Sequence, residues 1–331
     1  MKILLGDCLK QLKTLEDSSV DSLITDPPAG ISFMGKDWDD DKGGRDQWIA
    51  WMTDVMKECL RVMKPGAHGL VWALPRTSHW TATALENAGF EVRDVITHLF
   101  GSGFPKSHNI AKAIETAEAK QWEGWGTALK PASEHWILVR KPCSEKTVAK
   151  NVLKHGVGGI NIDECRIGSN PGYSYPNGAG GSSFSVGKGT DGTRTIPVQS
   201  TQGRFPANLV LSHSEHCTDT ECDQECAIKR LDEQSGILKQ GGASRFFYCA
   251  KASKADKGSE NTHPTVKSTK LMQYLIKLIT PPNGVVLDPF MGSGSTGVAA
   301  TELKFEFIGI EKEPEYHEIA LKRVASGDIL D

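Results

Sequence analysis

The residues best suited to chemistry are four consecutive ones near the start of the chain, Asp26-Pro27-Pro28-Ala29. The Asp26 carboxylate and the backbone carbonyl of Pro27 are both hydrogen-bond acceptors, and the adjacent prolines hold that carbonyl rigidly. Together they can accept both hydrogens of an amino group, which favours a pyramidal nitrogen whose lone pair is free to attack. In this scheme Asp26 is an orienting acceptor rather than a strong base.

A second segment, near the end of the chain, has the composition of a ligand-binding loop: Asp288-Pro289-Phe290-Met291-Gly292-Ser293-Gly294. Its glycines let the backbone approach a ligand closely and turn into a helix whose amino end points at that ligand. Glu311 follows at the end of the next expected strand, where a carboxylate can accept hydrogen bonds from ribose hydroxyls. A structural turn or an NAD site is the alternative, but the dinucleotide spacing G-x-G-x-x-G is absent.

The order of these motifs, with the catalytic one first and the glycine loop last, resembles the beta class of DNA amino-methyltransferases within the N-4/N-6 DNA methylases. The resemblance implies S-adenosylmethionine as methyl donor and an exocyclic amino nitrogen of a flipped DNA base as acceptor. An Asp at the first catalytic position favours adenine N6 over cytosine N4. The family resemblance also implies catalytic roles for Asp26, Pro27, Pro28 and Ala29. It implies cofactor contacts from Asp288, Pro289, Phe290, Gly292, Gly294 and Glu311.

Two further segments resemble the same family. His263-Pro264-Thr265-Val266-Lys267 resembles its His-Pro-Thr-x-Lys-Pro signature, with Ser268 at the usual proline position. Gly6-Asp7-Cys8 resembles the segment that contacts the cofactor adenine through an Asp, and capping of the next helix is the alternative for Asp7. The resemblance therefore adds five cofactor residues: Asp7, Cys8, His263, Thr265 and Lys267.

Ala29 departs from the family, whose fourth catalytic position is normally an aromatic residue that stacks on the flipped base. Stacking of a base on an aromatic ring is worth about 1 to 3 kcal/mol, so its loss weakens base capture without removing the chemistry at Asp26. Phe33 and Trp38 follow on the same loop and are candidates for a substitute ring. The alternatives are that both rings only pack on the domain, or that the chain is a noncatalytic relative that binds DNA or cofactor.

The elements that must position these residues alternate between strands and helices. Apolar runs at 3–5 and 22–25 read as buried strands, and the second ends where Pro27 stops the ladder. Together with the resemblance, the pattern predicts a Rossmann-like α/β fold with a mostly parallel seven-stranded sheet, helices on both faces and permuted motif order. Helices are expected at 46–63, 78–87, 268–279, 295–302 and 314–323, and further strands at 69–74, 90–99, 135–140, 285–287 and 305–310.

The chain divides into three expected parts. Residues 1–155 form the catalytic half of the methyltransferase domain and residues 245–331 the cofactor-binding half. Residues 156–244 form an inserted target-recognition region. Within it, Gly168 to Gly203 is dense in Gly, Ser, Asn and Thr and is expected to be a surface loop, either one that orders on DNA or one that is simply flexible.

A cluster of metal-ligating residues lies in the same region. His213, His216, Cys217, Cys222 and Cys226 fall in a short polar stretch that cannot bury an apolar core of its own. Cys217, Cys222 and Cys226 with His213 make a tetrahedral ligand set for a structural zinc ion. The spacing is not that of the familiar zinc fingers, and three free thiols in a surface loop are the alternative.

Composition sets the remaining limits. The net charge of −3 is unlike that of a protein held on DNA by bulk electrostatics, although residues 101–255 carry a basic excess of 19 Lys and Arg over 15 Asp and Glu. No apolar run is long enough to span a membrane, and Gly6-Asp7 follows the first apolar residues too soon for a signal peptide. Eight cysteines suit a reducing compartment. We therefore expect a cytoplasmic protein that binds double-stranded DNA and no membrane, with a homodimer as a candidate assembly.

Overall fold

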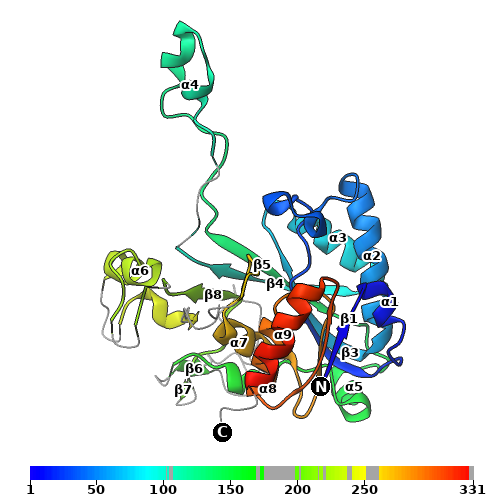
Figure 1. Cartoon of the computed structure of the whole chain (residues 1–331). Helices are drawn as coiled ribbons and strands as arrows, with labels where there is room; N and C mark the ends of the chain where they lie inside the picture. Colours follow the sequence, from blue (N-terminus) through cyan, green and yellow to red (C-terminus); the bar gives the residue numbers. More distant parts are fainter. Residues whose placement is uncertain are drawn as a thin grey trace.

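The main feature of the computed structural model is an α/β domain built on one large sheet (Figure 1). The structure describes residues 1–101, 103, 107–168, 172–174, 198–200, 203–214, 216–218, 221–236, 241–250 and 261–327. Within these residues the sheet has nine strands, and all run in one direction except β5. Their order across the sheet is β1 (Lys2–Leu5), β11 (Glu306–Glu311), β10 (Val285–Asp288), β2 (Val20–Thr25), β3 (Met63–Ala73), β5 (Ser133–Arg140), β4 (Glu91–Leu99), β8 (Leu209–Ser212) and β9 (Tyr248–Ala250).

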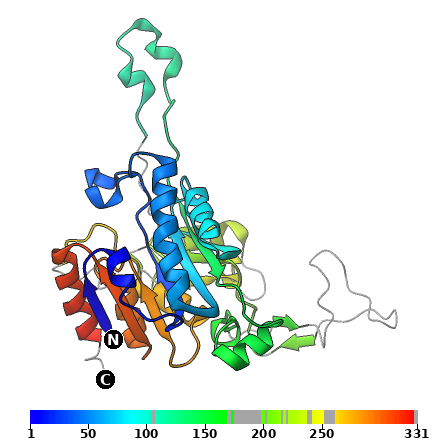
Figure 2. The same ribbon diagram turned by 90° about the vertical axis from the view of Figure 1, so that its right-hand side faces the viewer.

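Helices cover both faces of the sheet, as the sequence predicts (Figure 2). Neighbouring residues of a buried strand point to opposite faces, so Leu23 and Leu287 pack under one helical layer while Ile24 and Val286 pack under the other. The first layer is α1 (Cys8–Leu12), α2 (Arg45–Val62) and α3 (Ser78–Ala88), and the second is α7 (Thr269–Ile279), α8 (Ser295–Glu302) and α9 (Pro314–Gly327).

The sheet places the two chemically suited segments side by side. Strands β2 and β10 are parallel neighbours, with Ser22 opposite Val286 and Leu23 opposite Leu287. Because parallel neighbours end at the same edge, Asp26 and the glycine loop emerge together at the carboxyl ends of their strands. Asp26 and the glycine loop, which are far apart in the chain, therefore come together because β2 and β10 are neighbours in the sheet.

Strands β8 and β9 extend the sheet beyond the seven strands expected. Val210 of β8 pairs with both His98 of β4 and Tyr248 of β9. Each added strand is only three or four residues long, and a run this short carries too little periodicity to be distinguished from a turn. Strand β3 also begins earlier than expected. It tolerates Pro65 because the pairing of β2 with β3 is irregular between Val20 and Ser22.

The connection from β4 to β5 leaves the body as a long arm (Figure 1), which comprises residues 107–132. It contains α4 (Ile110–Ala113) and the 3₁₀ turn η3 (Ala117–Trp122). The arm closes on itself, since the Ile110 amide donates to the Trp125 carbonyl at 3.1 Å and the rings of Trp122 and Trp125 meet edge to face. No periodic pattern in the sequence predicted it.

Several short elements lie in the region expected to be an insertion. Strands β6 (Gly172–Ser174) and β7 (Val198–Ser200) form an antiparallel pair, so parts of the expected surface loop are ordered as strands. Most of the rest of that loop lies outside the described residues. Helix α6 (Ala227–Ser235) packs beside β8, and α5 (Val148–His155) precedes the region.

No helix in the described ranges has both the length and the apolarity to cross a membrane.

Candidate active site

A cavity of about 1100 Å³ opens at the carboxyl ends of β2, β10 and β11. It joins the catalytic motif to the glycine loop in one continuous space. Every predicted catalytic and cofactor residue except Gly294 lines it, namely Asp7, Cys8, Asp26, Pro27, Pro28, Ala29, Phe33, His263, Thr265, Lys267, Asp288, Pro289, Phe290, Gly292 and Glu311.

Asp26 forms an ion pair inside this cavity. The Lys267 ammonium lies 2.9 Å from its carboxylate and 4.4 Å from the centroid of the Trp72 ring. Burial raises the pKa of Asp26 above its usual value, and the charge and hydrogen bond of Lys267 oppose the rise. The pair therefore favours the charged form of a carboxylate that burial alone would tend to protonate.

Lys267 continues into a chain of polar side chains. Its ammonium also lies 3.7 Å from Glu134, whose carboxylate is 3.4 Å from Nδ1 of His98. Nε2 of His98 is in turn 2.7 Å from the Ser212 hydroxyl of β8. Burial alone would raise the pKa of Glu134, but Lys267 and His98 outweigh it and bring that pKa down to about 2. A chain of four side chains therefore leads from Asp26 to strand β8, namely Lys267, Glu134, His98 and Ser212.

Asp288 joins the end of β2 to the glycine loop. One carboxylate oxygen accepts a hydrogen bond from Thr25 at 2.7 Å, and the other accepts one from Thr296 at 2.6 Å. The amide of Phe290 also donates to Asp288 at 3.1 Å. Burial raises the pKa of Asp288 to about 7, although the hydrogen bonds from Thr296 and Thr25 act in the opposite direction. The Asp288 carboxylate therefore fixes the position of Thr25, the residue that precedes Asp26, relative to the glycine loop.

The glycine loop needs its two glycines for different reasons. Gly292 has a φ of +54°, and a Cβ there would lie 3.0 Å from the ring of His263. Gly294, with a φ of +85°, would place a Cβ 3.1 Å from Ala320 of α9, so it serves helix packing rather than the cavity wall. The Gly292 amide donates to Glu311 at 2.9 Å, and burial raises the pKa of that carboxyl.

The remaining predicted cofactor residues border the same cavity from two sides. Asp7 is the N-cap of α1 and accepts a hydrogen bond from the Lys10 amide, so the capping role expected as the alternative is present. Asp7 also lines the cavity. Burial raises the pKa of Cys8 to about 12. The ring of His263 meets Tyr316 edge to face at 4.5 Å, and burial lowers the pKa of His263 to about 4, so the ring is neutral near pH 7.

The loop after Ala29 is folded by a residue that sequence reasoning missed. Asp39 is buried and accepts hydrogen bonds from the amides of Gly30 at 2.9 Å and Phe33 at 2.8 Å. Phe33 and Trp38 consequently both line the cavity, and Trp38 stacks with His263 at a centroid distance of 6.2 Å. The indole nitrogen of Trp38 is buried and has no hydrogen-bond partner among the described residues.

Trp72, Glu134 and Tyr316 also line the cavity and were not predicted. Trp72 and Glu134 lie on the adjacent strands β3 and β5, and their position beside Lys267 follows from the order of strands in the sheet. A period-2 pattern identifies buried strand residues, but it does not say which strand lies next to which.

The structure also brings together the four residues predicted to bind metal. His213, Cys217, Cys222 and Cys226 place their ligand atoms within 4.8 Å of one another, at the outer edge of the sheet and apart from the cavity. His216 is exposed and lies outside this group.

Comparison with known proteins shows the family of the chain. The sequence model of the N6/N4 DNA methylases, described as DNA methylase, matches residues 20–322. The chain belongs to this family. It is 25% identical to the type II methyltransferase M.HindIII of Haemophilus influenzae over 96% of this chain and 93% of that protein. It is 42% identical to the type II methyltransferase M.HinfI of Haemophilus influenzae over 97% of this chain and 67% of that protein.

Among solved structures, the cytosine-N4-specific PvuII DNA methyltransferase is similar in fold. The TM-score is 0.52 at 16% identity, over 97% of this chain and 85% of that one. The resemblance drawn from the motifs and the predicted fold class are confirmed. The chain is a DNA amino-methyltransferase of this family, and S-adenosylmethionine is its methyl donor.

The cavity suits that cofactor on its own evidence. A cavity of this size can take a nucleoside-containing ligand together with a second planar group. Its wall combines a glycine turn opening a helix with a carboxyl at the end of the next strand, which are features that receive an amino-acid carboxylate and ribose hydroxyls respectively.

Proposed function

We propose that this methylase transfers a methyl group from S-adenosylmethionine to N6 of adenine in double-stranded DNA, with the target base flipped into the cavity. The observation that carries the proposal is the ion pair of Asp26 with Lys267 inside the cavity that also contains the glycine loop. An amino nitrogen conjugated to a base is a poor nucleophile, so two acceptors for its hydrogens are needed.

The protein groups have separate roles in this proposal. The Asp26 carboxylate accepts one hydrogen of the amino group and the Pro27 carbonyl accepts the other, with Pro28 and Ala29 completing the catalytic motif. Lys267 is a positioning residue that holds the Asp26 carboxylate charged and oriented. Asp288 is a second positioning residue, since it holds Thr25 next to Asp26. S-adenosylmethionine supplies a methyl group already activated by a positive sulfur, so orientation of the two reactants contributes most of the rate.

The cofactor would be held by the family residues that border the cavity. The loop from Asp288 to Gly294, including Pro289 and Phe290, turns the backbone toward the carboxylate end of the cofactor. Glu311, Asp7 and Cys8 line the cavity, and we assign Glu311 to hydrogen bonds with the ribose and Asp7 to a hydrogen bond with the adenine. His263 and Thr265 line the same side as Trp38. These assignments remain part of the proposal.

A ring from the loop after Ala29 would replace the missing aromatic residue. Phe33 and Trp38 border the cavity on this loop, and Asp39 fixes the backbone that carries Phe33. Aromatic rings at the mouth of a base-binding cavity can stack on a flipped base because every base has a π-face. Phe33 is therefore included with the catalytic residues.

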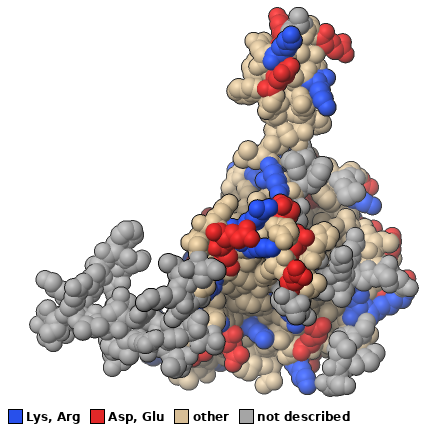
Figure 3. Space-filling model, turned by 90° about the vertical axis from the view of Figure 1, so that its left-hand side faces the viewer, with Lys and Arg blue, Asp and Glu red and all other residues tan. Residues whose placement is uncertain are grey.

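DNA would reach the cavity past the base of the arm. Residues 127–132 line the cavity, so a duplex that delivers a base must pass them. Lys and Arg on the face seen in Figure 3 are interspersed with Asp and Glu rather than gathered in one stripe. This pattern favours specific contacts with DNA over bulk electrostatic attraction.

We assign target recognition to residues 156–244. Residues 1–155 form the catalytic half of the domain and residues 245–331 the cofactor-binding half. We further propose that the protein is cytoplasmic, acts in a restriction–modification context and forms a homodimer.

The experiment that tests the proposal is nucleoside analysis of duplex DNA after incubation with the protein and S-adenosylmethionine. N6-methyladenine is the expected product. N4-methylcytosine would move the proposal to the alternative amino target with the same acceptors. The absence of any methylated base, in protein that binds the cofactor by calorimetry, would overturn the catalytic proposal in favour of a binding role.

A further inference from the structure

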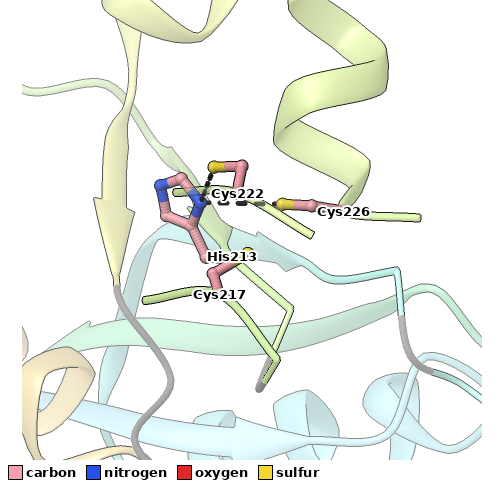
Figure 4. A group of neighbouring side chains, drawn as sticks. All are labelled: His213, Cys217, Cys222 and Cys226. Carbon is pink, nitrogen blue, oxygen red and sulfur yellow. Dashed lines mark hydrogen bonds between the residues drawn. The ribbon is translucent and has the colours of Figure 1, made fainter. Parts of the chain in front are cut away.

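The group of His213, Cys217, Cys222 and Cys226 lies at the far edge of the sheet, where the inserted region joins the domain (Figure 4). His213 follows the last residue of β8, and Cys226 is the residue that precedes α6. Figure 4 shows the imidazole of His213 directed at the sulfurs of Cys222 and Cys226. We propose that these four side chains bind one structural zinc ion that fastens the inserted region to the sheet.

The distances suit a shared ion. Nδ1 of His213 lies 3.3 Å from the sulfur of Cys222 and 3.6 Å from the sulfur of Cys226. Zn–S and Zn–N bonds of about 2.3 and 2.0 Å in a tetrahedron separate a sulfur from a nitrogen by roughly 3.5 Å. The four ligand atoms all fall within 4.8 Å of one another, so a tetrahedron forms with small adjustments.

The donor set favours zinc over harder cations. Three thiols and one imidazole are the ligands that Zn²⁺ takes in structural sites, whereas Mg²⁺ and Ca²⁺ prefer oxygen. Binding releases the three thiol protons to solvent and uses the neutral imidazole lone pair, so the completed site carries a net charge of −1. All four positions are filled by protein, which leaves no open position for catalysis and indicates a structural ion.

The described part of this region has only a small apolar core of its own. The apolar cluster around the site has three buried members among the described residues, Leu211, Cys226 and Ile228. A core this small contributes too little to order a loop of this length, and small modules of this kind commonly depend on a metal. The amide of Asp223 donates to the sulfur of Cys217 at 3.3 Å, which supports that sulfur as an anionic ligand.

The position of the ion links it to the rest of the fold. Ser212 immediately precedes His213, and its hydroxyl contacts His98 at 2.7 Å. His98 in turn contacts Glu134 beside Lys267. An ion that fixes the end of β8 therefore also fixes the outer end of the polar chain that leads to the cavity.

The main experiment is metal analysis of the full-length protein purified without chelators, with and without added zinc. We expect about one zinc per chain. Cys222→Ser and Cys226→Ser should each lower zinc content at least several-fold, because a ligand is lost. Cys249→Ser is the matched control, since Cys249 packs in the same apolar cluster but is outside the four-residue group, and it should retain the metal.

A second variant keeps the proposal testable where the serine variants do not fold. His213→Cys preserves four ligands, so it should retain about one zinc, and X-ray absorption should change from three sulfurs and one nitrogen to four sulfurs. Wild-type protein that takes up no zinc, or equal zinc in Cys222→Ser and wild type, would overturn the proposal. So would a disulfide located by peptide mapping between two of Cys217, Cys222 and Cys226, because those two thiols could then not bind the ion.

Discussion

The Lys267 ammonium lies 2.9 Å from the Asp26 carboxylate, although one residue comes from the last third of the chain and the other from its start. The pair joins two motifs that the sequence shows only separately. Since burial raises the pKa of Asp26 and Lys267 opposes the rise, the pair determines at which pH the acceptor is charged. The proposed chemistry needs that charge.

Replacing Lys267 with Met should move the acid limb of the methylation pH profile to higher pH. The carboxylate form of Asp26 is active and is present above its pKa, so removal of the opposing ammonium raises that pKa and moves the loss of activity upward. Displacement of the acid limb by one pH unit corresponds to about 1.4 kcal/mol of interaction between the two side chains. The profile of kcat against pH measures it, with exposed Lys270→Met as the control. A profile that falls in height without moving would leave Lys267 with no influence on the charge of Asp26.

Replacing Asp288 with Asn should alter how stability depends on pH. Because the pKa of Asp288 is raised to about 7, the folded state binds a proton that the unfolded state releases near pH 4, and wild type loses stability as pH rises between these values. Asn does not titrate, so wild type should lose about 2 kcal/mol relative to the variant between about pH 5 and pH 7. Urea unfolding at both pH values measures the difference. A constant difference would show that Asp288 titrates normally.

Gly292→Val should abolish cofactor binding. A Cβ at this position lies 3.0 Å from His263, and a branched side chain strains a φ of +54°. Gly35→Val is the matched control, since its φ is +68° but no atom lies within 4 Å of the added Cβ. Calorimetry with S-adenosylmethionine should detect binding to the control only. Equal affinity for the two variants would place the cofactor away from this loop.

Phe33→Ala or Trp38→Ala should reduce methylation by about 5- to 150-fold, the range that about 1 to 3 kcal/mol of base stacking implies. Cofactor affinity should hardly change. Phe246→Ala, at an exposed ring that does not line the cavity and lies outside residues 156–244, is the control. Normal rates in both variants would mean that neither ring replaces the aromatic residue missing at Ala29.

Individual helices, strands and motifs could be predicted from the sequence, but which of them lie next to one another could not. Helix α8 was expected at its observed bounds because the glycine loop defines its start, and β2 was expected because Pro27 ends it. The contacts of Lys267 with Glu134 depend on which strands are neighbours, and no short-range pattern carries that information. The cluster from His213 to Cys226 was predictable because its members are close in sequence, whereas β9 was too short to stand out.

Methyl transfer by an Asp26→Asn variant tests the central claim most directly. Asn keeps the shape of the side chain but loses the negative charge that accepts amino hydrogens and pairs with Lys267. Duplex DNA, radiolabelled S-adenosylmethionine and the variant should give less than about one hundredth of the wild-type rate, while calorimetry shows cofactor binding largely retained. A rate within about tenfold of wild type would contradict the assignment of Asp26 as the acceptor that activates the amino group.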